Sequence, residues 1–508
     1  MTTAEALYGA YQTARTSVLD RARTASDLTI PGLIPHDGND IHGSHTQPFQ
    51  SVGAALVGNL SASLLLALFP PNLPFFRLNM DEVTAEEMGA ELGEANARLA
   101  VLGRTVYSLM ESASLRPLLM EVIRHLVVAG NVLLYIPADG EPPKFYRLDQ
   151  YVVKRDGYGR FLDIVVREQV YPSTLSPEVR AACGVDYKEG DSEQPVDLFT
   201  MVQRRNKKVT HWQELRGKEV PGSRGESPEE SSGWIPLRWL VVPGSDYGRS
   251  HVTEYIGDLT TLEDLSKSMV QFAMVAARII HIVDPNAGVD VDELATAETG
   301  DFLTGYRDRI STMQLDKSQD WAVVNTLAER IEQRLSAAFL VRSGVMRDAE
   351  RVTAEEVRIV AQELENTLGG TYTVLSAELQ LPLTRRYLYM GARAGKVPKL
   401  PKEIQPRIIT GFDALGRAHS VNRIRAWLQG LQETVGPAVI QQIINVTELA
   451  RRLGEGEGVD GLEDLLKSPE QQAQEQQAAA QSQVGAAVAP EIVKQGLAGM
   501  AAEPEQPQ

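Results

Sequence analysis

The hydrophobic pattern of this 508-residue chain changes its period twice. Before residue 130 apolar residues recur every three or four positions, which predicts helices over 3–27, 49–69, 84–113 and 115–129. From Asn131 the period is two, which predicts a series of strands, and the helical period returns after residue 250. Helices and strands in separate blocks indicate a mainly α fold with a β-rich part, an α+β architecture.

The β-rich part is interrupted by two polar stretches. DGYG (156–159) is typical of a hairpin turn, and the piece 216–233 is expected to be a polar surface loop. The strand-like segments around them are NVLLYIP, KFYRLDQYVVKRD, FLDIVVREQVY, VDLFTMVQRR, KVTHWQEL and WIPLRWLVVP.

The most apolar segment of the chain is SVGAALVGNLSASLLLALF (51–69). Asn59, Ser61 and Ser63 interrupt it, and a Pro-Pro pair follows it. These interruptions favour a buried helix over a membrane span. No membrane partner is therefore expected.

Two further helices enclose a segment of mixed character. The first, after residue 250, is about 30 residues long, and its second half, MVQFAMVAARIIHIV (269–283), is apolar nearly all round. Such a surface requires burial on several sides. The second helix covers 323–341.

A third helix is predicted to begin at Thr353. Glu356, three residues later, completes a capping box. The polar loop before it carries Arg342, Arg347 and Arg351. Taken alone, these arginines are explained by surface ion pairs with nearby acidic residues, which contribute little free energy. Helical periodicity continues over 371–393, and 471–508 is a Gln/Ala-rich tail, either frayed helix or disordered.

The composition restricts the class of function. The formal net charge of −17 argues against a protein that coats nucleic acid. Cys183 is the single cysteine, so a disulfide framework is excluded and a reducing compartment is expected.

Motifs of catalysis are not found. The sequence has no G-x-x-x-x-G-K-[ST] phosphate loop, no G-x-S-x-G elbow and no H-E-x-x-H motif. His36, His42 and His45, with Asp37 and Asp40, have a spacing that allows metal binding, but a solvated polar loop is the favoured interpretation. We therefore predict no cofactor, no metal and no enzymatic activity.

Several blocks in order along the chain resemble one family, the portal or head-to-tail connector proteins of short-tailed phages of the T-seven type. The blocks are TIPGLIP (29–35), QSVGAALVGNLSASLLLALFP (50–70), LVVAGNVLLY (126–135), YGRSHVTEYIGDLTTLEDL (247–265), TGDFLTG (299–305), ERVTAEEVRIVAQELENTLGGTYTVLSAELQLPL (350–383) and ITGFDALGR (409–417).

The resemblance implies a ring, usually of twelve subunits, at one vertex of the capsid, assembled in the host cytoplasm. Its channel would pass double-stranded DNA without sequence specificity during packaging and ejection. A separate terminase and then tail adaptor and tail tube proteins would dock on it. The major capsid protein, scaffolding protein and, as an option, internal core proteins are further implied partners.

The resemblance also implies a division of the chain. It comprises a wing (1–245), a first stem helix (246–284), a clip (285–322), a second stem helix (323–341), a tunnel loop (342–352), a further wing helix (353–410), a crown (411–470) and the tail (471–508).

On this map, two groups of residues are implied to have functions. Arg342, Arg347 and Arg351 of the tunnel loop would contact DNA. The stem residues Met269, Phe272, Val275 and Ile279 would pack between neighbouring subunits. Two alternatives remain: another oligomeric virion component such as a tail adaptor, and a soluble enzyme with an unrecognised site.

Overall fold

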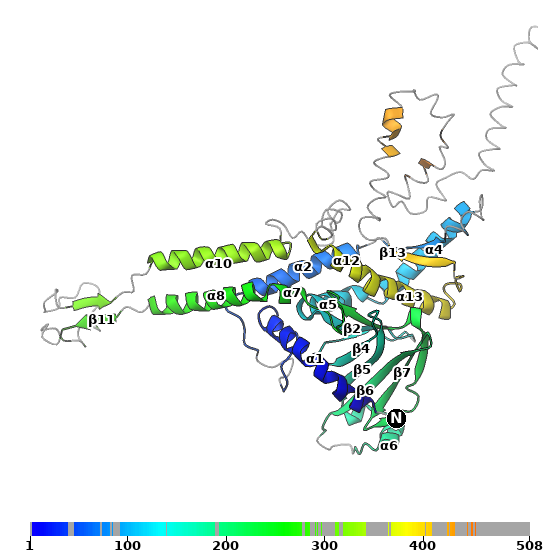
Figure 1. The fold of residues 1–508 in the computed structure, drawn as a ribbon, viewed down its shortest axis with the longest axis horizontal. Helices are drawn as coiled ribbons and strands as arrows, with labels where there is room; N and C mark the ends of the chain where they lie inside the picture. Colours follow the sequence, from blue (N-terminus) through cyan, green and yellow to red (C-terminus); the bar gives the residue numbers. More distant parts are fainter. Residues whose placement is uncertain are drawn as a thin grey trace, which may run out of the picture. The chain divides into compact units, whose positions relative to one another are not determined.

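The computed structural model describes residues 3–38, 45–71, 74–81, 92–138, 140–187, 193–276, 280–284, 310–313, 318–341, 367–401 and 403–408, with isolated positions between them and up to residue 453. The chain divides into two compact units, Met1–Phe412 and Asp413–Gln508. The fold that follows is that of the first unit (Figure 1).

The observed architecture is α+β, as predicted. The longer helices are α1 (Ala4–Asp27), α2 (Val52–Leu68), α4 (Leu92–Ser112), α5 (Leu115–Ala129), α8 (Ile256–Ala276), α10 (Ser318–Ala338) and α13 (Leu381–Arg393). Shorter ones are α6 (Pro177–Cys183), α7 (His251–Glu254) and α12 (Gly370–Leu375), with 3-10 turns at Pro172–Thr174 and Glu229–Ser231. A π-helical turn, Ser376–Gln380, joins α12 to α13, so the helical pattern does continue past Pro382.

The largest sheet has six antiparallel strands. Its order is β4-β5-β6-β7-β8, and β9 also pairs with β7. The strands are β4 (Tyr151–Arg155), β5 (Phe161–Val170), β6 (Val196–Arg205), β7 (Lys208–Leu215), β8 (Lys218–Glu219) and β9 (Gly225–Pro228). The piece 216–233, expected to be a loop, therefore contributes two short strands. They pair with the outer edge of β7, which would otherwise present unpaired backbone groups.

The described part of the chain also contains three smaller sheets. One has the order β10-β2-β3, from Trp234–Arg238, Asn131–Tyr135 and Lys144–Tyr146. A second joins β1 (Phe76–Met80) to β13 (Ile404–Ile408), and the third joins β11 (Ile280–Val283) to β12 (Ile310–Met313). Helix α6 and the strands β1 and β13 were not predicted.

Both faces of the six-stranded sheet are covered, because successive side chains of a strand point to opposite sides. Val152, Val165 and Met201 pack against α1, which lies across the sheet (Figure 1). Val153 and Ile164 pack in a second cluster that contains Trp234 of β10 and Leu133 of β2.

The helices share a separate and larger core. It includes fully buried side chains of α2 and α5, such as Leu60, Leu64, Ile123 and Leu126. The prediction that 51–69 forms a buried helix is thus confirmed. Among the residues that the structure describes, no helix has the length and apolar character needed to cross a membrane.

One glycine fixes the junction between this core and the following long helix. Gly130 ends α5 in the left-handed conformation, with φ of 73°. A Cβ atom at this position would lie 2.5 Å from the backbone nitrogen of Ser250. Next to it, Asn131 donates to the carbonyl of Gly248 and accepts from the Gly248 N–H. The AGN and YGRS segments therefore dock on each other and set where α7 begins.

Candidate assembly interface

The most distinctive element is an antiparallel pair of long helices, α8 and α10, which lie side by side (Figure 1). Arg334 of α10 bonds to Asp258 of α8 at 2.7 Å. At the other end, the rings of Phe272 and Trp321 stack with their centroids 5.0 Å apart. We call this pair, with the segment between its helices, the hairpin.

The two helices meet along a seam with heptad spacing. On α8 the seam runs through Leu259, Leu262, Ser266 and Met269, and on α10 through Trp321, Val324, Ala328, Ile331 and Leu335. Alternating steps of three and four keep such residues on one side of a helix. Leu259, Leu262, Ala328, Ile331 and Leu335 are all buried within the single chain. This burial anchors the hairpin to the helical core.

Beyond the seam, the hairpin exposes large apolar side chains. Val270 is 39% exposed, Met274 65% and Val275 48%. On α10, Val323 is 69% exposed and Leu327 is 46% exposed. All five lie in the half of the hairpin near the Phe272–Trp321 stack, where the core no longer covers it.

These five residues lie on two opposite faces. Val270 follows the seam residue Met269, whereas Leu327 precedes the seam residue Ala328. Antiparallel helices are related by a two-fold rotation, which places the same heptad position of both helices on the same face of the pair. Val270 and Leu327 occupy different heptad positions, one after and one before a seam residue, so they lie on opposite faces. At 100° per residue, Met274 joins Val270 on what we call the first face. Val275 and Val323 join Leu327 on the second face.

The predicted stem residues have different environments. Met269 is partly buried against the chain's own core, and Phe272 is half-buried in its stack with Trp321. Val275 is exposed on the second face. Ile279 lies outside the described residues. An intersubunit role for these four residues stays a prediction.

The predicted extent of the first long helix needs a correction. The helix was expected to reach residue 283, but α8 ends at Ala276 and residues 280–283 form β11. Ile280, Ile282 and Val283 are β-branched, and such side chains favour a strand. Ile280 pairs with Met313 in β12, so the segment between α8 and α10 contains its own two-stranded sheet.

The end of α10 is held by groups from two other elements. Asn59 of α2 donates to the carbonyl oxygens of Phe339 and Leu340, at 3.4 and 3.0 Å. The Nε2 atom of His251 lies 3.2 Å from the carbonyl oxygen of Ala338. The last carbonyls of a helix have no partner inside it, so these side chains satisfy the end of α10.

His251 is enclosed by aromatic rings. Those of Trp239, Tyr255 and Phe339 have centroids within 5.5 Å of its own. Burial lowers the pKa of His251 below its ordinary value, so the ring is neutral near pH 7. Leu340 follows with a positive φ of 58°, which turns the chain away from the helix direction. The structure therefore fixes the point from which the following loop departs.

The loop itself and its arginines, Arg342, Arg347 and Arg351, lie outside the described residues. So does the predicted helix start at Thr353. The DNA contact of these arginines stays a prediction.

The histidine-rich stretch was also a candidate site. His36 pairs with Asp27 at 2.9 Å, while Asp40 and His42 lie outside the described residues. In the part of the chain that the structure describes, no three His, Cys, Asp or Glu side chains gather closely enough to hold a metal ion.

Two residues that hold the hairpin in place, Asn59 and Trp321, were not identified from the sequence. Asn59 was seen only as an interruption in an apolar helix, and its partners lie about 280 residues away along the chain. Trp321 has a detectable signal, because it continues the three-four spacing of the α10 seam by one step.

Comparisons with known proteins cover nearly the whole chain. The model of a family described as bacteriophage head to tail connecting protein matches residues 1–462. The portal protein of Escherichia phage T7 is 36% identical over 517 residues, which cover 99% of this chain and 95% of that protein. The portal protein of Pseudomonas phage phiKMV is 34% identical, with 92% of this chain and 93% of that protein covered.

Solved structures with some likeness come from gene transfer agent particles. A chain from the neck of an empty particle has 14% identity and a TM-score of 0.39, with 80% of this chain and 90% of that chain covered. A chain from the virion of the native particle has 14% identity and a TM-score of 0.37, with 86% and 93% covered.

Proposed function

Because this chain belongs to the bacteriophage head to tail connecting proteins and shares the portal function of its relatives, we propose that it forms a ring around a channel for double-stranded DNA at one capsid vertex. The ring would hold twelve subunits. DNA would enter through it during packaging and leave through it during ejection. The role is structural, with the energy for packaging supplied by a separate terminase.

The observation that carries the ring is the two-faced hairpin. Val270 and Met274 on the first face, and Val275, Val323 and Leu327 on the second, are apolar and exposed in the single chain. Contiguous exposed apolar groups mark surfaces that another molecule covers. When the first face of one subunit packs on the second face of the next, the contact is heterologous, which is the arrangement that generates rings.

The remaining partners follow from the same role. The segment between α8 and α10 would face terminase and then the tail proteins, and the capsid and scaffolding proteins would surround the wing. Assembly would take place in the host cytoplasm. Arg342, Arg347 and Arg351 would contact DNA phosphates, which carry no sequence information, so the channel would be indifferent to base sequence.

Electron microscopy of the purified full-length protein tests the proposal. We expect rings with a central channel wide enough for B-DNA. A protein that stays monomeric at micromolar concentration would contradict the ring. A ring whose channel is too narrow for a duplex would instead favour a tail adaptor.

A further inference from the structure

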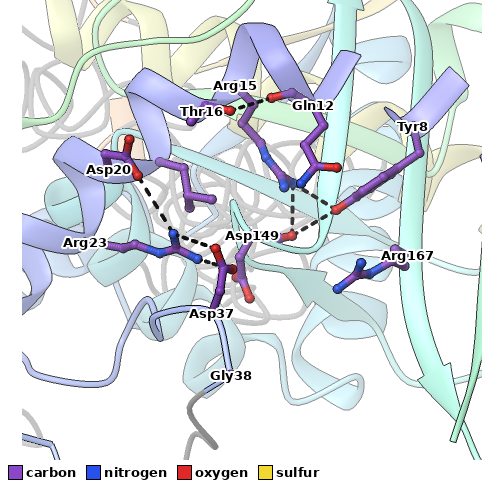
Figure 2. A pocket seen from close by; sticks show the side chains of 11 residues that line it. Tyr8, Gln12, Arg15, Thr16, Asp20, Arg23, Asp37, Gly38, Asp149 and Arg167 are labelled. Atoms are coloured by element: carbon purple, nitrogen blue, oxygen red, sulfur yellow. Dashed lines mark hydrogen bonds and ion pairs between the residues drawn. The ribbon is translucent and has the colours of Figure 1, made fainter. Parts of the chain in front are cut away.

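A polar pocket lies between α1 and the six-stranded sheet (Figure 2). Its volume is about 450 Å³. Arg15 and Arg23 of α1 line it together with Arg167 of β5, and so do Asp37 and Asp149. The proposed function uses none of these residues.

Arg15 is the unusual member of this set, because it is buried without an acidic partner. Only 3% of the surface of Arg15 is exposed. Its Nη1 atom donates to the Tyr8 hydroxyl and to the carbonyl oxygens of Leu148, Asp149 and Tyr151, at 2.8–3.1 Å. All four acceptors are neutral. The Nε atom is buried and donates to none of the described residues.

A buried charge that only neutral groups solvate is costly, and a nearby opposite charge reduces that cost. The carboxylates around the pocket are already bound by other arginines. Asp37 accepts from two nitrogens of Arg23, and Asp149 accepts from Arg147 at 3.0 and 2.8 Å. In the described part of the chain, no carboxylate forms an ion pair with Arg15.

Arg167 adds a second charge that is weakly compensated. Both guanidinium groups lie near the Tyr8 ring, with Arg15 Cζ 5.4 Å and Arg167 Cζ 5.7 Å from the ring centroid. The ion pair between Arg167 and Asp197 is 4.0 Å long, and the Arg167 side chain is 43% exposed. Figure 2 shows Arg15 and Arg167 on the same side of the pocket as Tyr8.

The positive field of this pair reaches across the pocket. The pKa of Asp37 is lowered from its ordinary value, first by its hydrogen bond to Arg23 and also by the charges of Arg15 and Arg167. An anion entering the pocket would experience the same two charges.

The lining also restricts which anion fits. Three arginines are balanced by three aspartates, since Asp20 also lines the pocket. A phosphate dianion or a nucleic acid would meet these carboxylates, and like charges repel. A single carboxylate avoids most of that repulsion and matches the planar fork of arginine. Tyr8 and Leu19 provide apolar contact for a short aliphatic stem.

We propose that this pocket binds the carboxylate of one acidic side chain, presented by a segment of a partner protein, with Arg15 and Arg167 as its ligands. The inference does not depend on the proposed ring, because every residue involved lies in one chain. It also differs from DNA binding, because the site selects against a polyanion.

Ligand-observed NMR with the full-length protein tests this binding. The probe is glutamate with both backbone ends capped as amides, and the matched probe is capped glutamine, which has the same shape without the charge. Since one charge-assisted hydrogen bond to arginine is worth about tenfold or more in affinity, we expect capped glutamate to bind at least about tenfold more tightly than capped glutamine.

Three variants assign the binding to the pocket. Arg15→Met and Arg167→Met should each abolish it. Because Arg15 ties α1 to the sheet, its variant is open to misfolding, whereas the half-exposed Arg167 is replaceable without such risk. Arg21→Met is the control, since Arg21 lies on the exposed side of the same helix and bonds to Ser17. It should bind like the unmodified protein.

Several results would overturn the proposal. Equal binding of the two capped amino acids would show that the carboxylate is irrelevant. Unchanged binding in Arg167→Met would place the ligand elsewhere. Displacement by equimolar inorganic phosphate would contradict the selection for a single carboxylate. Tighter binding of free acetate than of capped glutamate would identify a small-anion site and refute the protein segment.

Discussion

Replacing Met274 by glutamate should prevent assembly of the proposed ring while leaving the chain folded. Met274 is 65% exposed on the first face, so it contributes little to the core of its own chain. Complete burial of such a side chain is worth about 1.5–3 kcal/mol, so covering its exposed part contributes about 1–2 kcal/mol to each contact. An unpaired carboxylate in the contact adds a penalty of about 3–5 kcal/mol. The sum of about 4–7 kcal/mol weakens each contact by a factor of about a thousand or more.

Mass photometry and negative-stain microscopy at matched concentrations would measure the loss of rings. Circular dichroism and thermal unfolding of the same samples would show whether the subunit stays folded. Gln271→Glu provides the control, because it adds the same group three residues away, on the exposed ridge opposite the α8 seam. Val275→Glu repeats the test on the second face. Met269→Glu is less informative, because Met269 also packs against the chain's own core.

Rings of Met274→Glu at the yield of the unmodified protein would refute the reasoning. So would an equal loss of rings in Gln271→Glu, because added charge rather than the apolar faces would then explain the effect. Unfolded Met274→Glu subunits would contradict the exposed position of this side chain in the chain described here.

Three other perturbations have defined outcomes. Replacing Arg342, Arg347 and Arg351 together with alanine should leave ring assembly intact but reduce packaged or retained DNA, and normal DNA content in assembled particles would exclude the contact. Asn59→Ala should lower the free energy of unfolding in urea by about 1–2 kcal/mol, because two carbonyls at the end of α10 lose their donor. Burial lowers the pKa of His125 to about 4, below its value near 6.5 in the unfolded chain. The contribution of the neutral ring to the free energy of unfolding is therefore complete above pH 6.5 and is lost as the pH falls toward 4, because the unfolded chain binds the proton first. The free energy of unfolding, measured in urea at pH 7.5 and at pH 4, should therefore fall by about 2–3 kcal/mol less in His125→Leu than in the unmodified protein.

The local hydrophobic pattern was sufficient to predict a helix or strand wherever that segment packs against the core along its whole length. The helix expected over 3–27 is found at Ala4–Asp27, and the one expected over 115–129 is found with those bounds. Strand alternation correctly placed β5 and β6, since their two faces pack against different clusters. In these segments the burial of each residue follows from its neighbours in sequence.

Pairing between distant segments was not predictable in the same way. Phe76–Met80 forms a strand because Ile404–Ile408 lies beside it, and neither segment alone has a strong pattern. In the sequence Arg15 is one more charged residue on a helix, yet the three carbonyl oxygens that it binds lie more than 130 residues away. The hairpin was anticipated, but its two faces were not, because they depend on the antiparallel seam rather than on either helix alone.

The inequivalence of the two hairpin faces has a consequence for how assembly stops. A subunit that covers a neighbour's first face has an identical, uncovered first face of its own. Each addition therefore leaves one uncovered first face and one uncovered second face at the ends of the growing arc. These last two faces are covered only when the two ends of the arc meet and the ring closes. The angle between the faces, set by seam residues such as Leu262 and Ala328, would then determine the subunit number. Substitutions that change packing inside the seam should alter the number of subunits in a ring without touching any contact between them.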